Sequence, residues 1–416
     1  MSEVSPDRSA FLADFTTLSA FGSVDGGGVD RQAATAPDGE QRKWLAGLLG
    51  DHGFTVKRDA IGNLFGLLEL NPGAPYVLTG SHLDSQPTAG RFDGAYGVLA
   101  SAHACFRLAD EWKRDGRTPA LNLAVVDWFN EEGSRFKPSM MGSSVYTGKL
   151  PLETALATTD RSGTSVRDAL DTLDERGAFE APDVASYAEI HVQQGRSMEN
   201  DGLTIGLVNA TWAASKFDFE VTGDQAHTGS TIMADRRDAL LGASMLVVAA
   251  RELADQYPTE MLHTSVGELA VYPNSPVVVA SKVNLLLDLR SPDAAVIADA
   301  TAKLQDRISD IEKATDVVIT QTGSHSWDVN PYQPEGVKLA CTVAEALALP
   351  HDEVMTVAGH DSTNMKDIVP TVMLFVPSVD GVSHNVHECT SDADLLAGVD
   401  MLTAVVGRLA DGELVG

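Results

Sequence analysis

The first half of the chain alternates between two patterns of hydrophobic and polar positions. Residues 76–80 and 122–128 are short apolar runs, the second rich in β-branched residues, as is typical of buried parallel strands. Residues 41–52 and 97–112 instead repeat their apolar positions at the spacing of a helix. This alternation predicts an α/β layer with helices on both faces of a sheet.

Between residues 213 and 323 the pattern predicts a separate, smaller domain. Strand-like and helical stretches follow one another there in the order βαββαβ, which is that of a ferredoxin-like domain. The stretches lie at residues 216–222, 235–255, 262–271, 277–289, 293–313 and 316–322. From residue 330 the α/β pattern returns, with helices at 335–348 and 391–409 and a strand at 371–375. We therefore expect a domain at 213–323 inserted into a discontinuous domain of residues 1–212 and 324–416.

The charge balance narrows the class of partner. The 416-residue chain has 59 Asp and Glu residues against 30 Lys and Arg residues, which gives a formal net charge of −29. Such a field repels phosphate groups, and no run of basic residues reverses it locally. Nucleic acids and anionic membranes are therefore not expected as partners.

Cysteine usage and apolar runs predict the location of the protein. Cys105, Cys341 and Cys389 are far apart and odd in number, so they form no disulfide framework, which fits a reducing cytoplasm. The N-terminal stretch MSEVSPDRSAFLADF lacks the basic and apolar regions of a signal peptide. The longest apolar stretches are far shorter than the ~20 residues that span a bilayer. We expect a soluble, cytoplasmic protein.

Five polar clusters stand where a sheet of this kind would place a site. They are GSHLDS at 80–85, RFDGAYG at 91–97, NEEG at 130–133, EIHVQQG at 189–195 and GVSH at 381–384. Four of them follow strand-like runs, and α/β sheets bind ligands in the loops at the carboxyl ends of strands. Taken singly, their members also fit loop histidines, turn residues, helix caps or solvated carboxylates. Their conjunction favours a common site.

The residue types in these clusters suit divalent metal ions. Imidazole nitrogen and carboxylate oxygen together are ligands for Zn²⁺, Mn²⁺, Co²⁺ or Ni²⁺. Two ions about 3.5–4 Å apart need a bridging carboxylate to offset their repulsion, and Asp93 is a natural bridge. His82 and His191 are then candidate ligands of one ion, and Glu132 and His384 of the other.

The Glu131-Glu132 pair predicts catalysis as well as binding. Adjacent residues that leave a strand point in different directions, so Glu132 can bind metal while Glu131 faces the bound water. A metal lowers the pKa of that water from ~15.7 towards ~7, and a carboxylate there can take its proton and deliver it to a leaving nitrogen. The sequence has no GxSxG, HExxH or Walker-type motif to support a competing design.

The same motifs, with others further along the chain, carry a family resemblance. They are GSHLDS at 80–85, FDG at 92–94, EEGSRF at 131–136, HVQQG at 191–195, GDQAHTG at 223–229, RRDA at 236–239, DLR at 288–290, GHD at 359–361, FVPS at 375–378 and GVSH at 381–384. Together they resemble the metal-dependent hydantoinase/carbamoylase amidohydrolases. That family includes N-carbamoyl-L-amino acid hydrolases, β-ureidopropionases and allantoate amidohydrolases, and is related to aminoacylases and dinuclear zinc exopeptidases. The motifs are more specific for the family than for a substrate.

The resemblance implies a fold and a set of metal ligands. The fold would be a discontinuous α/β catalytic domain, with two divalent ions per subunit and an inserted ferredoxin-like lid and dimerisation domain. The implied metal ligands are His82, Asp93, Glu132, His191 and His384, with Asp93 bridging. Glu131 would be the general acid and base, and Asp84 would orient the imidazole of His82.

The resemblance also implies how a small-molecule substrate is held. His227 would stabilise the oxyanion, commonly from the neighbouring subunit of a homodimer joined through the smaller domain. Gln194 would hold the ureido group, Arg290 the substrate carboxylate, and His360 would also contact substrate. Without the resemblance, the residues favour a surface or dimer contact for His227, and they also fit an ion pair of Arg290 with a neighbouring aspartate and a tight turn at the GHD motif.

One departure from the family bears on the substrate. The family has an Asn-Val-Ile-Pro-Gly stretch whose Asn contacts substrate, and residues 277–281 correspond to it, with Val277 in the place of the Asn. An apolar residue there predicts a substrate less polar than a standard N-carbamoyl amino acid, and disfavours allantoate with its two ureido groups. We predict a hydrolase of the non-peptide amide C–N bond of an N-carbamoyl amino acid or a less polar analogue. The alternatives are an aminoacylase or dipeptidase and a non-catalytic binding protein on the same fold.

Overall fold

The computed structural model describes residues 6–415; the first five residues of the stretch used for the signal-peptide prediction lie outside them. The chain divides into two compact units. Unit 1 comprises Met1–Asn209 and Tyr332–Gly416, and unit 2 comprises Ala210–Pro331. Each unit has a mixed α/β structure, as the sequence predicts.

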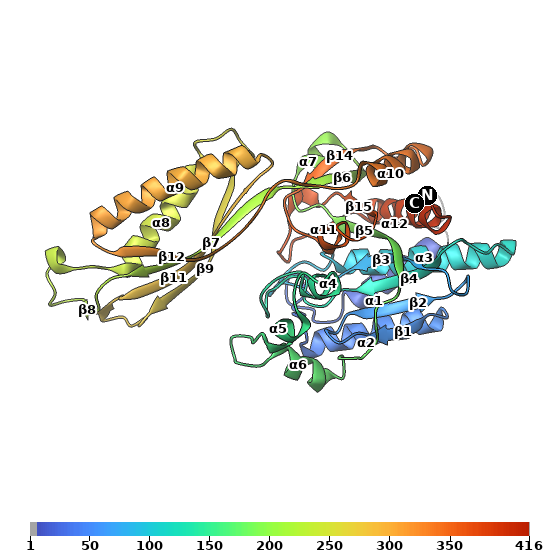
Figure 1. Ribbon diagram of the computed structural model, residues 1–416, viewed down its shortest axis with the longest axis horizontal. Helices are drawn as coiled ribbons and strands as arrows, with labels where there is room; N and C mark the ends of the chain where they lie inside the picture. The colour runs from blue at the N-terminus through green and yellow to red at the C-terminus, as the bar shows by residue number, and fades with distance from the viewer. Residues whose placement is uncertain (1–5, 416) are drawn as a thin grey trace. The chain divides into compact units, whose positions relative to one another are not determined.

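The framework of unit 1 is a mixed sheet with the strand order β1-β2-β4-β3-β5-β15-β6, in which β14 also pairs with β6 (Figure 1). The last two residues of β6 belong to unit 2 and pair there with β13. The strands are β1 (Thr55–Arg58), β2 (Leu64–Leu68), β3 (Tyr76–Ser81), β4 (Asn122–Asp127), β5 (Val184–Val192), β6 (Ile205–Thr211), β13 (Asn330–Pro331), β14 (His351–Thr356) and β15 (Thr371–Val376). At its centre β4, β3, β5 and β15 run parallel to one another. Their carboxyl ends therefore lie at one edge.

The central strands are buried because helices cover both faces of the sheet. Every residue of β4 and of β15 is buried. Along β4, Leu123 and Val125 belong to the apolar cluster on one face, whereas Ala124 and Val126 belong to the cluster on the other. This division explains why the sequence shows a continuous apolar run rather than alternation.

The helices of unit 1 follow the sheet connections. They are α1 (Pro6–Leu18), α2 (Ala36–Asp51), α3 (Ala95–Asp115), α4 (Met141–Tyr146), α5 (Leu152–Ala157), α6 (Val166–Leu173), α7 (Ser197–Asp201), α10 (Pro334–Ala346), α11 (Asp361–Met365) and α12 (Asp392–Ala410), with the 3-10 turn η2 (Val379–Gly381). Helices α3 and α12 pack side by side on the larger apolar cluster (Figure 1). The sequence predicts α3 within two residues at its start, and Gly116 ends it in the left-handed conformation.

A buried ion network fixes the loop that follows β3. The guanidinium of Arg42 lies 2.5 Å from Asp127 and 3.1 Å from Glu175, and its side chain is 3% exposed. The other carboxylate oxygen of Asp127 accepts the backbone N–H of Leu83 at 2.9 Å. The ion pair on α2 is thus connected through the end of β4 to the residue next to His82.

Unit 2 has an antiparallel sheet with the strand order β12-β7-β11-β9, and α8 and α9 pack on one apolar cluster with it (Figure 1). Its elements are β7 (Ala213–Thr222), β8 (Ala226–His227), the 3-10 turn η1 (Met233–Asp235), α8 (Ala239–Ala254), β9 (His263–Tyr272), β10 (Val278–Val279), β11 (Lys282–Ser291), α9 (Ala294–Thr315) and β12 (Val318–Trp327). The long elements follow the order βαββαβ. Strands β8 and β10 form a separate antiparallel pair.

Two boundaries in unit 2 differ from the sequence prediction. The helix predicted from residue 235 begins at Ala239, because the Asp238 side chain accepts the backbone N–H groups of Leu240 and Leu241 as an N-cap. The strand predicted at 277–289 is two strands, β10 and β11, separated at Ala280-Ser281. Among residues 6–415, no helix is both long enough and apolar enough to cross a membrane.

Candidate metal centre

The parallel strands of unit 1 bring five predicted metal ligands to one edge of the sheet. His82 directly follows β3, Glu132 follows β4, and His191 is the penultimate residue of β5. Asp93 precedes α3, and His384 lies in the loop after β15. The loops come together because the strands that carry them are parallel neighbours.

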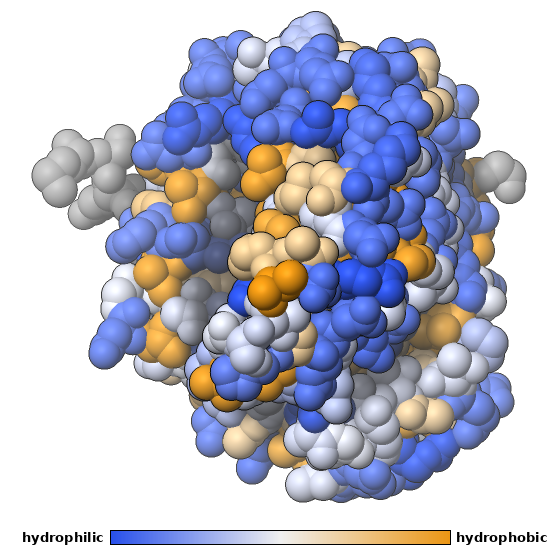
Figure 2. All heavy atoms as spheres, turned by 90° about the vertical axis from the view of Figure 1, so that its left-hand side faces the viewer, coloured by the Kyte–Doolittle hydropathy of each residue, from blue (hydrophilic) through white to orange (hydrophobic). Residues whose placement is uncertain are grey.

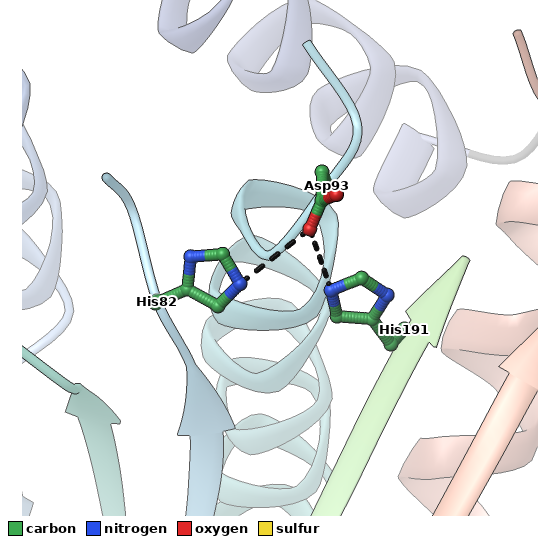
Figure 3. A group of neighbouring side chains, drawn as sticks. All are labelled: His82, Asp93 and His191. Carbon is green, nitrogen blue, oxygen red and sulfur yellow. Dashed lines mark ion pairs between the residues drawn. The ribbon is translucent and has the colours of Figure 1, made fainter. Parts of the chain in front are cut away.

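Asp93 lies between two histidines (Figure 3). Its Oδ1 is 2.9 Å from Nε2 of His191 and 3.5 Å from Nε2 of His82. All three side chains are buried. Each imidazole also has its Nδ1 close to a backbone carbonyl oxygen, at 3.0 Å in His82 and 2.8 Å in His191. A carbonyl only accepts, so in the neutral rings the proton is on Nδ1 and the Nε2 lone pairs face Asp93.

The second oxygen of Asp93 faces a second group. Its Oδ2 is 3.3 Å from Nε2 of His384, which is 3.4 Å from Oε2 of Glu132. Among residues 6–415, the groups whose ligand atoms lie within 4.8 Å of one another include His82-Asp93-His191 and Asp93-Glu132-His384. The two groups share Asp93, as two ions bridged by one carboxylate require. The nitrogen and oxygen donors present therefore fit two divalent cations.

The electrostatics of the centre are those of a cation site. Burial by itself would raise the pKa of the Asp93 carboxyl, but the charge and hydrogen bonds of His191, with His384 and His82, hold that pKa well below its ordinary value. Burial, with a smaller contribution from neighbouring Asp93, raises the pKa of Glu132 to about 7 against the opposing effect of His384. So many buried carboxylates within a few ångströms repel one another, and bound cations would offset that repulsion.

Glu131 lies at the same centre. Its Oε2 is 3.5 Å from Nε2 of His82, and the residue is 7% exposed. Burial raises the pKa of the Glu131 carboxyl well above its ordinary value; His82 opposes the shift, while Asp361 and Glu132 add to it. A carboxylate that prefers to hold a proton, next to metal-binding groups, has the properties of a general base.

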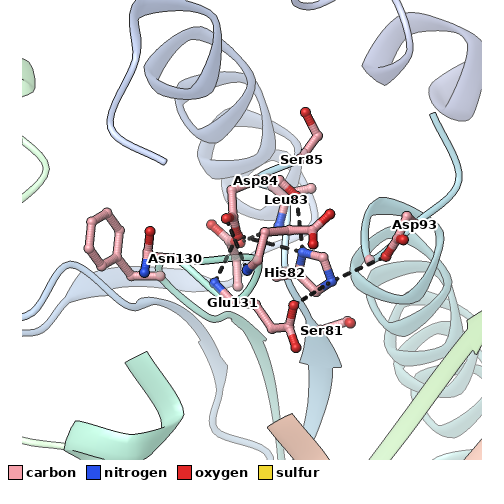
Figure 4. A network of polar contacts seen from close by, with 12 residues as sticks. Ser81, His82, Leu83, Asp84, Ser85, Asp93, Asn130 and Glu131 are labelled. Carbon is pink, nitrogen blue, oxygen red and sulfur yellow. Dashed lines mark hydrogen bonds and ion pairs between the residues drawn. The ribbon is translucent and has the colours of Figure 1, made fainter. Parts of the chain in front are cut away.

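Asp84 has a broader role than the orientation of His82 (Figure 4). Its Oδ1 lies 3.5 Å from Nδ1 of His82 and accepts the backbone N–H of Glu131 at 3.0 Å. Its Oδ2 accepts the backbone N–H of Glu132 at 3.3 Å. The side chain of Asp84 therefore fixes the backbone of both glutamates, and the closest partner of His82 Nδ1 is the Asp84 carbonyl oxygen rather than its carboxylate.

Asn130 makes the sharp turn that separates β4 from the two glutamates. Its φ is 52°, in the left-handed region that Asn tolerates better than most residues. Its side-chain amide donates to the carbonyl oxygens of Phe136 at 2.8 Å and Pro138 at 3.2 Å. The asparagine of the NEEG motif thus holds the loop that presents Glu131 and Glu132.

Gly94 leaves the space that His82 fills. It has a φ of 62°, and a Cβ at this position would lie 2.4 Å from both Cε1 and Nε2 of the His82 ring. We expect Gly94→Ala to lower the melting temperature and to weaken metal binding, because both the backbone and the imidazole must shift. Metal content after dialysis and a thermal melt measure the two effects.

Gly47→Ala is the matched control for that substitution. Gly47 lies within α2, and a Cβ there meets nothing within 4 Å. This change is expected to stabilise the protein by up to about 1 kcal/mol, because alanine favours a helix interior over glycine. Equal metal content and stability in both variants would show that the close approach at Gly94 is unimportant.

Gln194 contacts the bridging carboxylate. Its Nε2 donates to Oδ2 of Asp93 at 2.9 Å and lies 3.1 Å from Oγ of Ser383. Ser383 itself donates to Oδ2 of Asp93 at 3.1 Å. The structure thus places Gln194 at the centre, beside the groups that a substrate would approach.

His360 is buried against the metal group. Its ring lies 4.5 Å from that of His191 and 5.4 Å from that of Phe375. Burial lowers the pKa of His360 well below its ordinary value, and positive charge on His191 adds to the effect. Within the described residues its Nε2 is a buried atom without a hydrogen-bond partner, which suits a ligand that approaches it.

Three further residues support the centre, and the sequence alone assigned a role to none of them. Gln86 donates from its backbone and its side chain to the Glu132 carboxylate, at 3.1 and 2.9 Å. Glu388 accepts the backbone N–H groups of Phe92 and Asp93, each at 3.1 Å. Ser383 is the third. Gln86 is next to the GSHLDS cluster and Ser383 lies within the GVSH cluster, but nothing in the sequence marks Glu388.

His227 and Arg290 lie in unit 2. Nδ1 of His227 accepts the backbone N–H groups of Gly229 and Ser230 at 3.0 and 3.1 Å, so the neutral ring carries its proton on Nε2. The ring is exposed on β8, which pairs with β10. Arg290 contacts Oδ2 of Asp288 through Nε at 3.0 Å and Nη2 at 2.8 Å, which is the ion pair that the sequence left open.

Comparison with known proteins supplies the family. The pattern of Peptidase family M20/M25/M40 matches residues 78–408, a stretch that includes every predicted site residue. The chain belongs to this family. The match covers well over half of the chain and both of its units.

The relatives of this M20 protein are similar over nearly their whole length. A hydrolase from Mycolicibacterium smegmatis is 56% identical over 410 residues, which are 97% of this chain and 93% of the relative. An N-carbamoyl-L-amino acid amidohydrolase from Geobacillus stearothermophilus is 34% identical over 95% of this chain and 97% of that protein. The crystal structure of a hydantoinase/carbamoylase family amidase from Burkholderia vietnamiensis has a TM-score of 0.90 at 32% identity, over 97% of both chains. The resemblance expected from the motifs is confirmed.

Proposed function

We propose that this M20 protein is a dinuclear metal-dependent amidohydrolase that cleaves the non-peptide C–N bond of an N-carbamoyl amino acid or a less polar analogue. The observation that carries the proposal is the pair of ligand groups that share Asp93, with Glu131 next to them. Relatives named as N-carbamoyl-L-amino acid amidohydrolases support the choice of bond. Zn²⁺, Mn²⁺, Co²⁺ and Ni²⁺ all suit the nitrogen and oxygen donors.

Each of the two groups of donors would hold one metal ion. His82 and His191 would hold one ion and Glu132 and His384 the other, with Asp93 held between them. When bound, the ions would polarise the scissile carbonyl and lower the pKa of water. Asp84 keeps the backbone of Glu131 and Glu132 fixed while this chemistry proceeds.

Glu131 would then move the protons. As base it takes a proton from the attacking water, and as acid it passes that proton to the leaving nitrogen, so that the amine departs neutral. Burial of the Glu131 carboxyl favours its protonated form between the two steps. A carbamoyl product would break down to carbon dioxide and ammonia, whereas an N-acyl substrate would yield a carboxylic acid.

Substrate recognition is proposed for four side chains. Gln194 and His360 lie at the metal groups and would contact the ureido group, and Arg290 would pair with the substrate carboxylate. His227 would donate from Nε2 to the oxyanion, and the backbone bonds at its Nδ1 select the tautomer that can do so. Val277 is 58% exposed, its carbonyl oxygen accepts the backbone N–H of Thr228 at 3.2 Å, next to His227, and its side chain would favour an apolar substrate group.

Unit 2 is proposed as a lid and dimerisation domain that joins two copies of the chain. Leu241, Met245 and Val248 recur at helical spacing on α8 and are 50%, 36% and 55% exposed. Figure 2 shows apolar residues among hydrophilic ones on the face that it presents. Exposed apolar residues on one helix face are typical of a surface that another protein covers.

The proposed homodimer can be tested by substitutions on α8 that should separate its two copies and so lower the molar mass in solution. Leu241→Asp with Val248→Asp places two charges on the exposed face of α8, and we expect the molar mass measured by light scattering to halve. Glu180→Gln, at an exposed position of unit 1, is the control and is expected to leave the mass unchanged. A wild-type protein that is monomeric at micromolar concentration would contradict the proposed dimer.

Ammonia release tests the proposed reaction. Metal-loaded enzyme is offered matched N-carbamoyl, N-formyl and N-acetyl derivatives of amino acids with apolar side chains, together with allantoate. The proposal expects the highest kcat/KM for an N-carbamoyl derivative, with one ammonia for each free amino acid. Turnover of the N-acyl compounds alone, without ammonia, would assign the enzyme to the aminoacylase alternative.

A further inference from the structure

A second set of metal-ligating side chains lies away from the candidate centre. Cys341 and Glu345 are on α10, and His351 is the first residue of β14, which packs against that helix (Figure 1). One ligand atom from each of the three lies within 4.8 Å of the other two. None of the three belongs to the groups that share Asp93. Unlike those groups, this set includes a thiol.

The two elements place the three donors together for reasons visible in the sequence. Cys341 and Glu345 are four residues apart, so they lie one above the other on the same face of α10. The connection between α10 and β14 is short and turns at Ala348, whose φ is 53°. This turn brings His351 back to the face of α10 that carries Cys341 and Glu345. Cys341 is half-buried and Glu345 is exposed, which leaves the cluster open to ions from solvent.

The imidazole of His351 is already arranged as a ligand. Its Nδ1 is 2.7 Å from the carbonyl oxygen of Leu349, which only accepts, so Nδ1 carries the proton and donates. A metal-binding histidine is commonly fixed in this way by a backbone carbonyl. Nε2 then carries the lone pair that can bind a metal ion, and it lies 3.7 Å from Sγ of Cys341.

That separation matches the spacing of two ligands on one ion. Zinc binds thiolate sulfur at about 2.3 Å and imidazole nitrogen at about 2.0–2.1 Å, and at the tetrahedral angle these bonds place the two atoms about 3.5 Å apart. Sγ and Nε2 need to move by only a few tenths of an ångström. A thiolate, a carboxylate and a neutral imidazole also balance the charge of a divalent cation.

We propose that Cys341, Glu345 and His351 bind one Zn²⁺ ion per chain, in addition to any ions at the Asp93 centre. Water would occupy the fourth position, because three side chains supply the protein ligands. Binding releases the proton of the Cys341 thiol and ties the end of α10 to β14, a strand that pairs with β6 at the side of the sheet. The ion would therefore stabilise this edge of unit 1 rather than take part in hydrolysis.

Cobalt substitution tests the site in the whole protein, because a thiolate bound to Co²⁺ gives a near-ultraviolet charge-transfer band. The ligands at the Asp93 centre are nitrogen and oxygen donors, so that band reports on a cysteine ligand alone. The proposal expects the band in the wild type, its loss in Cys341→Ser and in His351→Ala, and its retention in Cys389→Ser. Cys389 is exposed, which makes it the matched thiol control.

Metal counting by mass spectrometry completes the test after equilibration with Zn²⁺ and removal of unbound ion. Cys341→Ser is expected to hold one zinc ion fewer than the wild type, while its hydrolytic activity and its Asp93 centre are unchanged. Equal zinc content in wild type, Cys341→Ser and His351→Ala would overturn the proposal. So would a charge-transfer band that persists without Cys341. Neither result depends on the identity of the substrate.

Discussion

Replacing Glu131 with Gln is expected to lower kcat/KM by about 10²–10⁴-fold while both metal ions stay bound. The amide has nearly the same shape as the carboxylate but takes no proton from water and passes none to the leaving nitrogen. Glu131 lies 3.5 Å from His82 and is outside both groups of three ligands, so its loss should spare metal binding. Steady-state kinetics and metal analysis on the same sample measure the two quantities.

A surface glutamate provides the control for Glu131→Gln. Glu180 is exposed and lies between α6 and β5, so Glu180→Gln makes the same chemical change away from the centre. This variant is expected to keep wild-type activity and metal content. Near-normal turnover of Glu131→Gln with its metals in place would remove Glu131 from the role of general acid and base.

Asp93→Asn is expected to empty both metal positions together. Asp93 gives one oxygen to the side of His82 and His191 and the other to the side of His384, and an amide cannot bridge two cations with two anionic oxygens. Mutation of a residue that only hydrogen-bonds to a metal ligand typically lowers the metal affinity by about 10–100-fold. Loss of the shared ligand itself should therefore lower the affinity by more than that at both positions. Activity should fall to background.

The loss of metal should also appear in stability. Ions that bind only the folded chain add about 2.7 kcal/mol to the free energy of unfolding at 100 times their dissociation constant. Chelation should therefore destabilise the wild type by about that amount for each ion of the Asp93 centre. Asp93→Asn should lose only what the ion proposed at Cys341 contributes. Asp110→Asn, at an exposed position of α3, is the control. An Asp93→Asn protein that retains one tightly bound ion beside His82 and His191, or beside Glu132 and His384, would show that the two positions are independent.

Much of the arrangement follows from the sequence because parallel strands have a simple geometry. The apolar runs at β3 and β4 predict buried neighbours, and polar residues at their carboxyl ends must then lie at one edge of the sheet. This geometry predicts from the sequence that His82 and Glu131 share one site. It identifies residues whose chemistry is evident from their type and whose place is set by the end of a strand.

Other contributions depend on tertiary contacts that no local pattern encodes. Glu388 accepts the backbone N–H groups of Phe92 and Asp93, which are 296 and 295 residues away in the sequence. The role of Asp84 also depends on such contacts, because its carboxylate accepts the backbone N–H groups of Glu131 and Glu132. In such cases the partner is a backbone amide, and a backbone amide leaves no signature in the sequence.

Local competition explains the remaining differences. Asp238 could extend a helix or cap one, and its side-chain hydrogen bonds decide that α8 begins after it. The apolar run at 277–289 is long enough for one strand, but the chain changes partner at Ala280-Ser281, from β8 to β7 and β9. Periodicity alone does not locate such a change, since the residues on both sides of it have the pattern of a strand.

The central claim is that Asp93 bridges two ions at the edge of the unit 1 sheet. Anomalous X-ray diffraction from crystals of the metal-loaded protein tests it most directly, because the scattering of each ion gives its position. The account predicts two peaks about 3.5–4 Å apart, one beside His82 and His191 and one beside Glu132 and His384, with Asp93 between them. A single peak, or two peaks without Asp93 between them, in crystals of fully active protein would contradict it.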